Sequence, residues 1–245
     1  MAPQPQMSRQ DAIATQALLS GLTSLSARAG HDLLGSLNQA RTLLALFINR
    51  YRNQLDADAD RLLEHMQSAS TRMEGVVAGI RKFMEIAGRP PRFETVDLNT
   101  TLASSLGLLQ KPIAECGAVI AADPLPVVSA DAVHMLTMFE ILIGNAMKFR
   151  RPDAPPYIQV SFRQAGDFPC VAIADNGIGI DPEYRDLVFL PFRRLNGAEY
   201  PGAGLGLATA KLITEMHGGN IRIDKAPDPE QSPHGMCVQF TVGPA

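Results

Sequence analysis

Two short segments in the second half of the chain carry residue types that suit a nucleotide. Asn145 lies within a helical run and offers an amide oxygen to Mg²⁺, and Lys148, on the same helix face, offers an ammonium group to phosphate oxygens. Asp175 follows an apolar strand and precedes Gly177 and Gly179. Its carboxylate could accept the amino hydrogens of an adenine, while the glycines let the backbone come close to the base.

A glycine-rich turn further along the chain adds groups suited to phosphate. Gly202, Gly204, Leu205 and Gly206 belong to a Gly-Ala-Gly-Leu-Gly run that opens a helical pattern. Backbone amides at the start of a helix, with the positive end of the helix dipole, favour a bound phosphate. No strand directly precedes this run and no βαβ unit follows it, so it is not a dinucleotide-binding fingerprint. Each segment, taken alone, also fits an ordinary turn or a polar helix end.

His31 is the candidate nucleophile, more than a hundred residues upstream on a long predicted helix. It lies two residues from both Ala29 and Leu33, roughly opposite the apolar seam of that helix and therefore toward solvent. Asp32 could hold the imidazole in its nucleophilic tautomer and accept its proton. Position alone is weak evidence, because an exposed histidine on a helix is usually only solvated. The remaining histidines are predicted to be structural or surface residues: His65, His134, His234, and His217 at a helix end, where the dipole favours a cation.

The order of these segments resembles the catalytic core of two-component sensor histidine kinases. The helix with Asn145, the turn after Asp175, a Phe-rich stretch at 189–192 and the glycine-rich turn are similar to the N, G1, F and G2 boxes of the family's ATP domain. Finer similarity at residues 143–150 and 192–196 points to the soluble, phytochrome-like and PAS-linked branch.

The resemblance implies that the C-terminal domain binds ATP and Mg²⁺, with Asn145 as the metal ligand. Residues 189–202 would form a mobile lid over ATP that contains Phe192, Arg193 and Arg194. One of the two arginines would reach the phosphates.

The resemblance also implies a reaction and partners. His31, followed by Asp32 as in the family's H box, would take the γ-phosphoryl group of ATP and pass it to an aspartate on a response-regulator receiver domain. Only about thirty residues precede His31, too few for a folded sensor. Input would therefore come from an upstream sensor domain, a partner protein or the leading helix.

Three positions depart from the family's usual pattern. Ser36 stands where a proline is usual, and Gly35 stands where several subfamilies have a polar residue associated with phosphatase activity. Ile141 replaces a second asparagine four residues before Asn145.

Two alternatives stay open. The first is a dimeric histidine phosphotransferase or scaffold with a degenerate ATP-binding domain, which Ile141 favours and Asp175 opposes. The second is an ATPase of the related gyrase and chaperone superfamily. It would need a carboxylate at position 141 and a further domain that supplies a lysine.

Two long helices must position His31. Residues 8–87 contain no proline and follow a helical period, interrupted by a polar stretch at 53–58 in which Asp56 or Asp58 would cap the second helix. Each helix carries an apolar seam: Leu22, Leu25, Ala29, Leu33, Leu37, Ala40, Leu44, Phe47 and Tyr51 on the first, and Leu62, Met66, Ala69, Met73, Val76, Ile80, Phe83 and Ala87 on the second. A hairpin of two such helices leaves one apolar face uncovered, so we expect a homodimer that completes a four-helix bundle.

The nucleotide segments need a different scaffold, which begins after Gly88-Arg89-Pro90-Pro91. Beyond this boundary the pattern predicts strands at 93–98, 157–163, 170–174, 221–223 and 236–242, and helices at 102–116, 133–149 and 205–217. The fold class is therefore α plus α/β: a helical hairpin, then an α/β sandwich of the histidine kinase, gyrase and chaperone type. We expect a dimerisation and phosphoacceptor domain at 1–88 and an ATP-binding domain at 92–245.

Composition excludes several other classes of protein. A net charge of −3, with no basic cluster beyond paired arginines, argues against a nucleic-acid partner. The longest strongly apolar stretch, residues 43–48, is too short to span a bilayer, and the N-terminus lacks the regions of a signal peptide. Three scattered cysteines have no metal-ligand spacing and suit a reduced core. We therefore expect a cytoplasmic protein.

Overall fold

The computed structural model describes residues 35–36, 39–51, 56–166, 168–195, 200, 202–226 and 235–243. The chain divides into two compact units, Met1–Arg89 and Pro90–Ala245. Among the described residues, no helix has the length and apolar character needed to cross a membrane.

The first unit contains a helix over residues 39–51 and the long helix α2 (Ala57–Ala87). Of the two candidate caps, Asp56 is the one that starts α2, because its carboxylate accepts a hydrogen bond of 2.8 Å from the backbone N–H of Ala59. The helix ends at Gly88, whose N–H donates to the carbonyl of Met84 at 2.9 Å. The prolines that follow cannot continue it.

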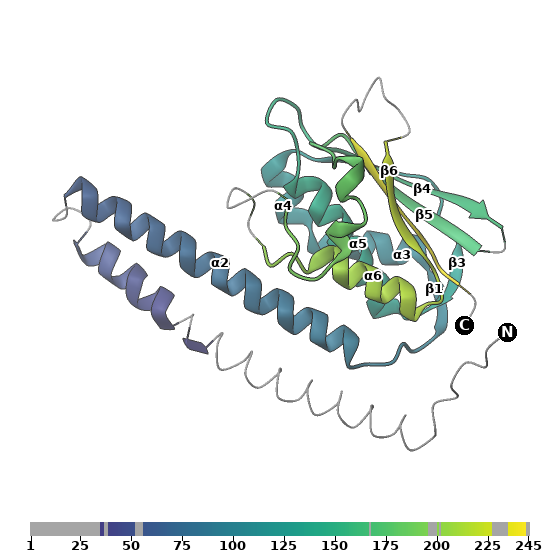
Figure 1. Ribbon diagram of the computed structural model, residues 1–245, viewed down its shortest axis with the longest axis horizontal. Helices are drawn as coiled ribbons and strands as arrows, with labels where there is room; N and C mark the ends of the chain where they lie inside the picture. The colour runs from purple at the N-terminus through teal and green to yellow at the C-terminus, as the bar shows by residue number, and fades with distance from the viewer. Residues whose placement is uncertain are drawn as a thin grey trace, which may run out of the picture. The chain divides into compact units, whose positions relative to one another are not determined.

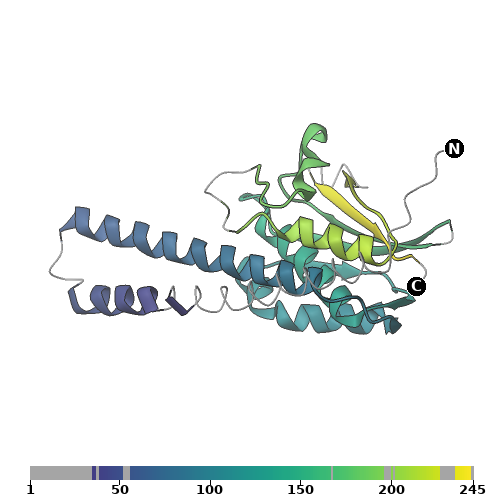
Figure 2. The same ribbon diagram turned by 60° about the horizontal axis from the view of Figure 1, so that its bottom comes forward.

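The two helices of the first unit lie side by side, as Figures 1 and 2 both show. An ion pair of 3.4 Å between Arg41 and Glu74 joins them. Several large apolar side chains stay exposed on the single chain, and Leu62, Met66 and Met73 show 64%, 57% and 49% of their surface to solvent. One copy of this unit therefore leaves apolar seam residues uncovered.

The second unit is built on a five-stranded sheet. Its strands, in spatial order, are β2 (Val119–Ala122), β4 (Tyr157–Ala165), β5 (Phe168–Asp175), β7 (Met236–Thr241) and β6 (Ile221–Lys225). β2 runs parallel to β4, and the other neighbours are antiparallel. The sheet is therefore mixed, as the fold class predicts.

The remaining elements surround this sheet. They are the two-stranded ribbon of β1 (Glu94–Asp97) and β3 (Val127–Ala130), the helices α3 (Leu98–Leu108), α4 (Gln110–Cys116), α5 (Ala132–Lys148) and α6 (Gly206–Met216), and two 3₁₀ turns, η1 (Pro182–Tyr184) and η2 (Leu187–Phe189). Figure 1 shows α3, α5 and α6 gathered over one face of the sheet, and α5 contacts both of the others.

Alternation along the strands separates the two faces of the sheet. Val160, Ile173 and Val238 lie opposite one another across β4, β5 and β7, and all three are buried on the face that α5 covers. The helix layer adds the fully buried Phe139 and Ile143. The main core of the second unit therefore lies between the sheet and its helices.

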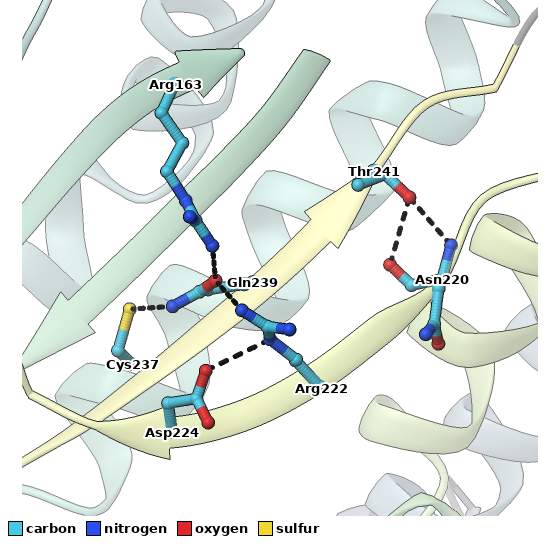
Figure 3. A network of polar contacts seen from close by, with 7 residues as sticks. All are labelled: Arg163, Asn220, Arg222, Asp224, Cys237, Gln239 and Thr241. Atoms are coloured by element: carbon cyan, nitrogen blue, oxygen red, sulfur yellow. Dashed lines mark hydrogen bonds and ion pairs between the residues drawn. The ribbon is translucent and has the colours of Figure 1, made fainter. Parts of the chain in front are cut away.

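The opposite face of the sheet carries a polar network (Figure 3). Arg163 and Arg222 both donate to the side-chain oxygen of Gln239, at 2.6 and 3.0 Å. Asp224 pairs with Arg222 at 3.0 Å. The Gln239 amide nitrogen in turn donates to the Cys237 sulfur at 3.7 Å. Hydrogen bonds between side chains of β4, β6 and β7 thus cross this face.

The helix predicted over 102–116 is wrong in its extent, because the structure has α3 and α4 with a break at Leu109. α3 begins earlier, at Leu98, since Asp97 caps it through the N–H of Asn99 at 2.9 Å. It ends at Leu108 because Pro112 has no N–H to give to that carbonyl and its ring would collide with it. The short strands β2 and β3 were not predicted.

His217 is buried at the end of α6, in agreement with the structural role that is one of the two predicted for it. Its Nε2 accepts from the backbone N–H of Asp131 at 3.1 Å, and its Nδ1 donates to the carbonyl of Ile213 at 2.8 Å. Its ring also contacts Phe93, and the Asp131 carboxylate accepts from the N–H of Arg92 at 2.8 Å. This buried cluster anchors the start of the second unit to α5 and α6.

Candidate functional site

The candidate site is built around the last turn of α5. This helix starts where the buried Asp131 carboxylate accepts hydrogen bonds from the backbone N–H groups of Val133 and His134 at 3.0 and 3.1 Å. Its apolar residues are buried on the core, which fixes the direction in which it ends. Asn145 and Lys148 lie near that end and are half-buried. Both predicted ligands thus sit on a rigid element.

Asp175 ends β5 and is only 6% exposed. Burial raises the pKa of its carboxyl to about 6, although hydrogen bonds from the backbone N–H groups of Gly177 and Met236 act in the opposite direction. The bond from Gly177 measures 2.9 Å. The carboxyl group is therefore held in a fixed place while retaining the capacity to accept further hydrogen bonds.

Gly177 brings the loop after Asp175 against the end of α5. A Cβ atom at this position would lie only 2.6 Å from the carbonyl oxygen of Phe149, so only glycine permits the approach. The same carbonyl accepts a hydrogen bond of 3.0 Å from the N–H of Ile178. Gly179 follows with a φ of 73°, in the left-handed region that glycine adopts readily.

The glycine-rich turn also lies against α5. A Cβ atom on Gly206 would be 3.7 Å from the Asn145 amide nitrogen and 3.4 Å from Cγ2 of Ile141. A Cβ atom on Gly202 would be 3.0 Å from the Lys148 Nζ. The two ends of the turn therefore lie beside Asn145 and Lys148.

α6 begins directly after this turn without a side-chain cap. Leu205 occupies the N-cap position, where it is buried and makes no capping hydrogen bond through its side chain. The first N–H groups of a helix have no partner within the helix. The start of α6 therefore has the character expected of a phosphate-binding turn.

Phe192 to Arg194 lie against the same turn. The N–H of Phe192 donates to the carbonyl of Gly204 at 3.0 Å, and a Cβ atom on Gly204 would be 2.7 Å from the carbonyl oxygen of Arg193. Phe192 has a φ of 63°, rare for a residue other than glycine, and is 61% exposed. This backbone conformation is unfavourable for phenylalanine, so contacts with neighbouring residues, such as the hydrogen bond to Gly204, must hold it.

Lys148 shares its surroundings with two aromatic residues. Its Nζ lies 4.6 Å from the centroid of the Phe149 ring, and that ring lies 5.0 Å from the ring of Tyr200. Burial, and then repulsion from Arg194, lower the pKa of the ammonium group. Sequence reasoning placed Tyr200 only within the lid predicted over residues 189–202 and gave neither aromatic residue a role of its own. The adjacent cation and aromatic ring in Lys148-Phe149 is the signal that could have found the first of them.

The structure thus gathers most of the predicted site residues around the end of α5: Asn145, Lys148, Asp175, Gly177, Gly179, Phe192, Arg193, Arg194, Gly202, Gly204, Leu205 and Gly206. His31 and Asp32 lie outside the described residues, so the phosphoacceptor stays a prediction. Within the described part of the chain, no group of three or more His, Cys, Asp or Glu side chains could hold a metal ion.

Comparison with known proteins identifies the family. A family model described as the histidine kinase-, DNA gyrase B- and HSP90-like ATPase matches residues 130–245. Cyanobacterial phytochrome A of Nostoc sp. is 35% identical over 215 residues, which is 87% of this chain and 27% of that protein. The chain belongs to the histidine kinases. This histidine kinase core spans only about a quarter of the length of that curated relative.

Solved structures agree with this fold. A mycobacterial sensor histidine kinase, MprB, matches with a TM-score of 0.53 and 28% identity, covering 63% of this chain and all of that one. Full-length ShkA, in a crystal structure with AMPPNP, matches with a TM-score of 0.63 and 22% identity. That match covers 89% of this histidine kinase core and 45% of ShkA, and shows likeness of fold.

Proposed function

We propose that this chain is an ATP-dependent protein-histidine kinase that phosphorylates its own His31. The observation that carries the proposal is the convergence on one helix end, where Gly177, Gly202 and Gly206 each approach α5 so closely that a larger side chain would meet it. The crystal structure of ShkA, which has a similar fold, is a complex with the nucleotide analogue AMPPNP and supports ATP as the ligand.

In this proposal each part of ATP meets a different group. The Asp175 carboxylate accepts the amino hydrogens of adenine, and the uncapped amides of α6 receive phosphate oxygens. Lys148 and Arg194 add positive charge beside them, and their repulsion, seen in the lowered pKa of Lys148, would be relieved by an anion.

Mg²⁺ fits the same arrangement. It usually takes only one or two protein ligands and completes its shell with water and phosphate oxygens. Asn145 is then a sufficient protein ligand, although the described residues include no larger acidic cluster. The ion would supply neutralising charge at the phosphates.

The chemical step is a phosphoryl transfer. A ring nitrogen of His31 attacks the γ-phosphorus, the N–P bond forms, the bond to the β–γ bridging oxygen breaks, and ADP leaves with the electron pair. Asp32 accepts the imidazole proton. The phosphoryl group then passes to an aspartate on a response-regulator receiver domain.

The proposal includes a homodimer through the helices of domain 1–88, with nucleotide binding in domain 92–245. The exposed apolar residues Leu62, Met66 and Met73 support a second copy as the cover of the seam. An upstream sensor domain or partner protein supplies the signal, and the reaction takes place in the cytoplasm.

A dimeric phosphotransferase or scaffold that no longer binds ATP is the second candidate. The packing of Ile141 within 3.4 Å of the Cβ position of Gly206 favours it, because an apolar contact occupies the place of a polar residue of the N box. Calorimetric titration with ATP and Mg²⁺ separates the two candidates, since only the kinase binds the nucleotide.

Incubation with γ-labelled ATP tests the kinase proposal directly. We expect label on the unmodified protein that is lost in acid, as a phosphoramidate is, and no label on His31→Gln with ATP binding retained. His65→Gln serves as the matched control on a helix of the same unit and should keep the label. Label that survives acid, or that persists on His31→Gln, contradicts the mechanism.

A further inference from the structure

Tyr200, which falls within the lid predicted over residues 189–202, contacts the surroundings of both cations of the candidate site. Its ring packs at 5.0 Å and 42° on the ring of Phe149, and the Lys148 ammonium lies 4.6 Å from the centroid of that same Phe149 ring. Tilted aromatic pairs are attractive, and a cation is drawn to the face of an aromatic ring. Tyr200 therefore supports the surface on which the ammonium rests.

The backbone of Tyr200 makes a second link, to Arg194. Its carbonyl oxygen accepts a hydrogen bond of 2.7 Å from Nη2 of that arginine. A bond of this length to a guanidinium group is charge-assisted and stronger than a neutral one. One half-buried residue thus joins Lys148, through Phe149, to Arg194.

The two cations need such support because they repel each other. The charge of Arg194 acts on Lys148 strongly enough to lower the pKa of the ammonium, in addition to the effect of burial. The missing side chain of Gly202 leaves room for the Lys148 Nζ beside the glycine-rich turn, since a Cβ atom on Gly202 would be only 3.0 Å from it. A carbonyl oxygen and a ring face compensate positive charge without adding an anion that would compete with phosphate.

We propose that Tyr200 is a positioning residue that holds Lys148 and Arg194 together for the phosphate groups of ATP. This inference rests on the proposed function and deepens it. It assigns to Tyr200 a part of the affinity that depends on the phosphates and leaves recognition of adenosine to Asp175. Loss of the Tyr200 ring should therefore weaken binding of the triphosphate more than binding of the nucleoside.

Titration of the full chain with two ligands tests the inference. ATP with Mg²⁺ is measured by calorimetry and adenosine by its displacement of bound nucleotide. We expect Tyr200→Ala to lower the affinity for ATP about five- to tenfold and to leave that for adenosine unchanged, since one aromatic contact and one cation support are lost. Every variant at this position keeps the backbone carbonyl, and Tyr200→Phe also keeps the ring, so Tyr200→Phe should bind ATP as tightly as the unmodified protein.

A second substitution distinguishes a selective effect on phosphate binding from a general disturbance of the structure. Phe149→Leu removes the ring between Tyr200 and Lys148 and should reproduce the selective loss of ATP affinity. Tyr200→Ala added to that variant should then have little further effect, because the two act through one contact. Equal losses for ATP and adenosine, equal ATP affinity in all variants, or additive losses would each overturn the inference. An unmodified protein that binds no ATP would instead overturn the proposed function itself.

Discussion

At the scale of single residues, the buried carboxyl of Asp175 is the most unusual group of the site. Its pKa of about 6 in the folded chain lies above the ordinary value of 3.8, and burial is the main cause. The folded state therefore holds a proton in the interval between these values that the unfolded chain has released. The contribution of Asp175 to stability consequently falls as pH rises through this interval, by about 3 kcal/mol when the whole shift is counted.

We predict that Asp175→Asn becomes progressively more stable than the unmodified protein as pH rises from 4 to 7. The neutral amide avoids the cost of burying a charge. Comparing the variant with the unmodified protein at two pH values cancels the changes in hydrogen bonding that do not depend on pH. Urea denaturation at pH 4 and at pH 7 measures the difference. The exposed Asp181→Asn is the matched control and should show no such trend. A stability difference that is the same at both pH values contradicts the prediction.

The same substitution should also weaken the binding of ATP. Asp175→Asn presents a donor where the adenine amino group needs an acceptor, and Asn145→Ala removes the amide oxygen proposed for Mg²⁺. We predict at least a tenfold loss of ATP affinity in the presence of Mg²⁺ for each variant, about the effect of one charge-assisted hydrogen bond. Calorimetry should also show that Asn145→Ala loses less when Mg²⁺ is absent. Unchanged affinity in both variants would show that the site lies elsewhere.

At the scale of elements, α5 organises the site because two other segments come close to its last turn. The loop after β5 reaches it through Gly177, and the turn before α6 reaches it through Gly202 and Gly206. Each contact depends on the missing side chain of a glycine. Segments that are weak motifs when taken alone thus form one site, because their glycines let the backbone come closer to α5 than other residues would allow.

We predict that Gly177→Ala lowers ATP affinity more than tenfold while the protein stays folded. The new methyl group would lie 2.6 Å from the Phe149 carbonyl and 2.9 Å from the Asp175 carboxylate, so the loop must move away from α5. Calorimetry measures the affinity, and circular dichroism checks the fold. Gly107→Ala in α3 is the matched control, since its methyl group would meet nothing within 4 Å. It should raise stability by about 0.5–1 kcal/mol and leave binding unchanged.

At the scale of the whole molecule, the two units differ in how completely each buries its apolar residues. The second unit encloses its core between the sheet and its helices, whereas Met73 and Leu62 in the first unit stay about half exposed or more. Seams of this kind are normally covered by another helical surface.

We predict that the chain is a homodimer and that Met73→Glu dissociates it, because a buried, unpaired charge costs several kcal/mol. A charge at Leu44 should act in the same way. Light scattering at micromolar concentration gives the mass, and Gln67→Glu, on the exposed side of α2, should leave the dimer intact. A monomer mass for the unmodified protein would contradict the proposed homodimer.

The order of the motifs, the helices with a clear period and the family could all be predicted from the sequence, because these depend on local spacing. α5 was predicted at 133–149 and observed at Ala132–Lys148. Strands such as β2 could not be found in this way, since four residues show no period of their own and are defined by pairing with β4. The hydrogen bond from the N–H of Asp131 to His217 likewise joins residues far apart in the sequence, and no local pattern predicts it.

How the motifs meet depends on the tertiary structure. The approach of Gly177 to Phe149 and the packing of Tyr200 on Phe149 join residues that are tens of positions apart, and no local pattern encodes them. The raised pKa of Asp175 likewise follows from burial beneath the packed layers. Such properties depend on what surrounds a side chain in space, because desolvation and close contact act over a few ångströms irrespective of separation along the chain.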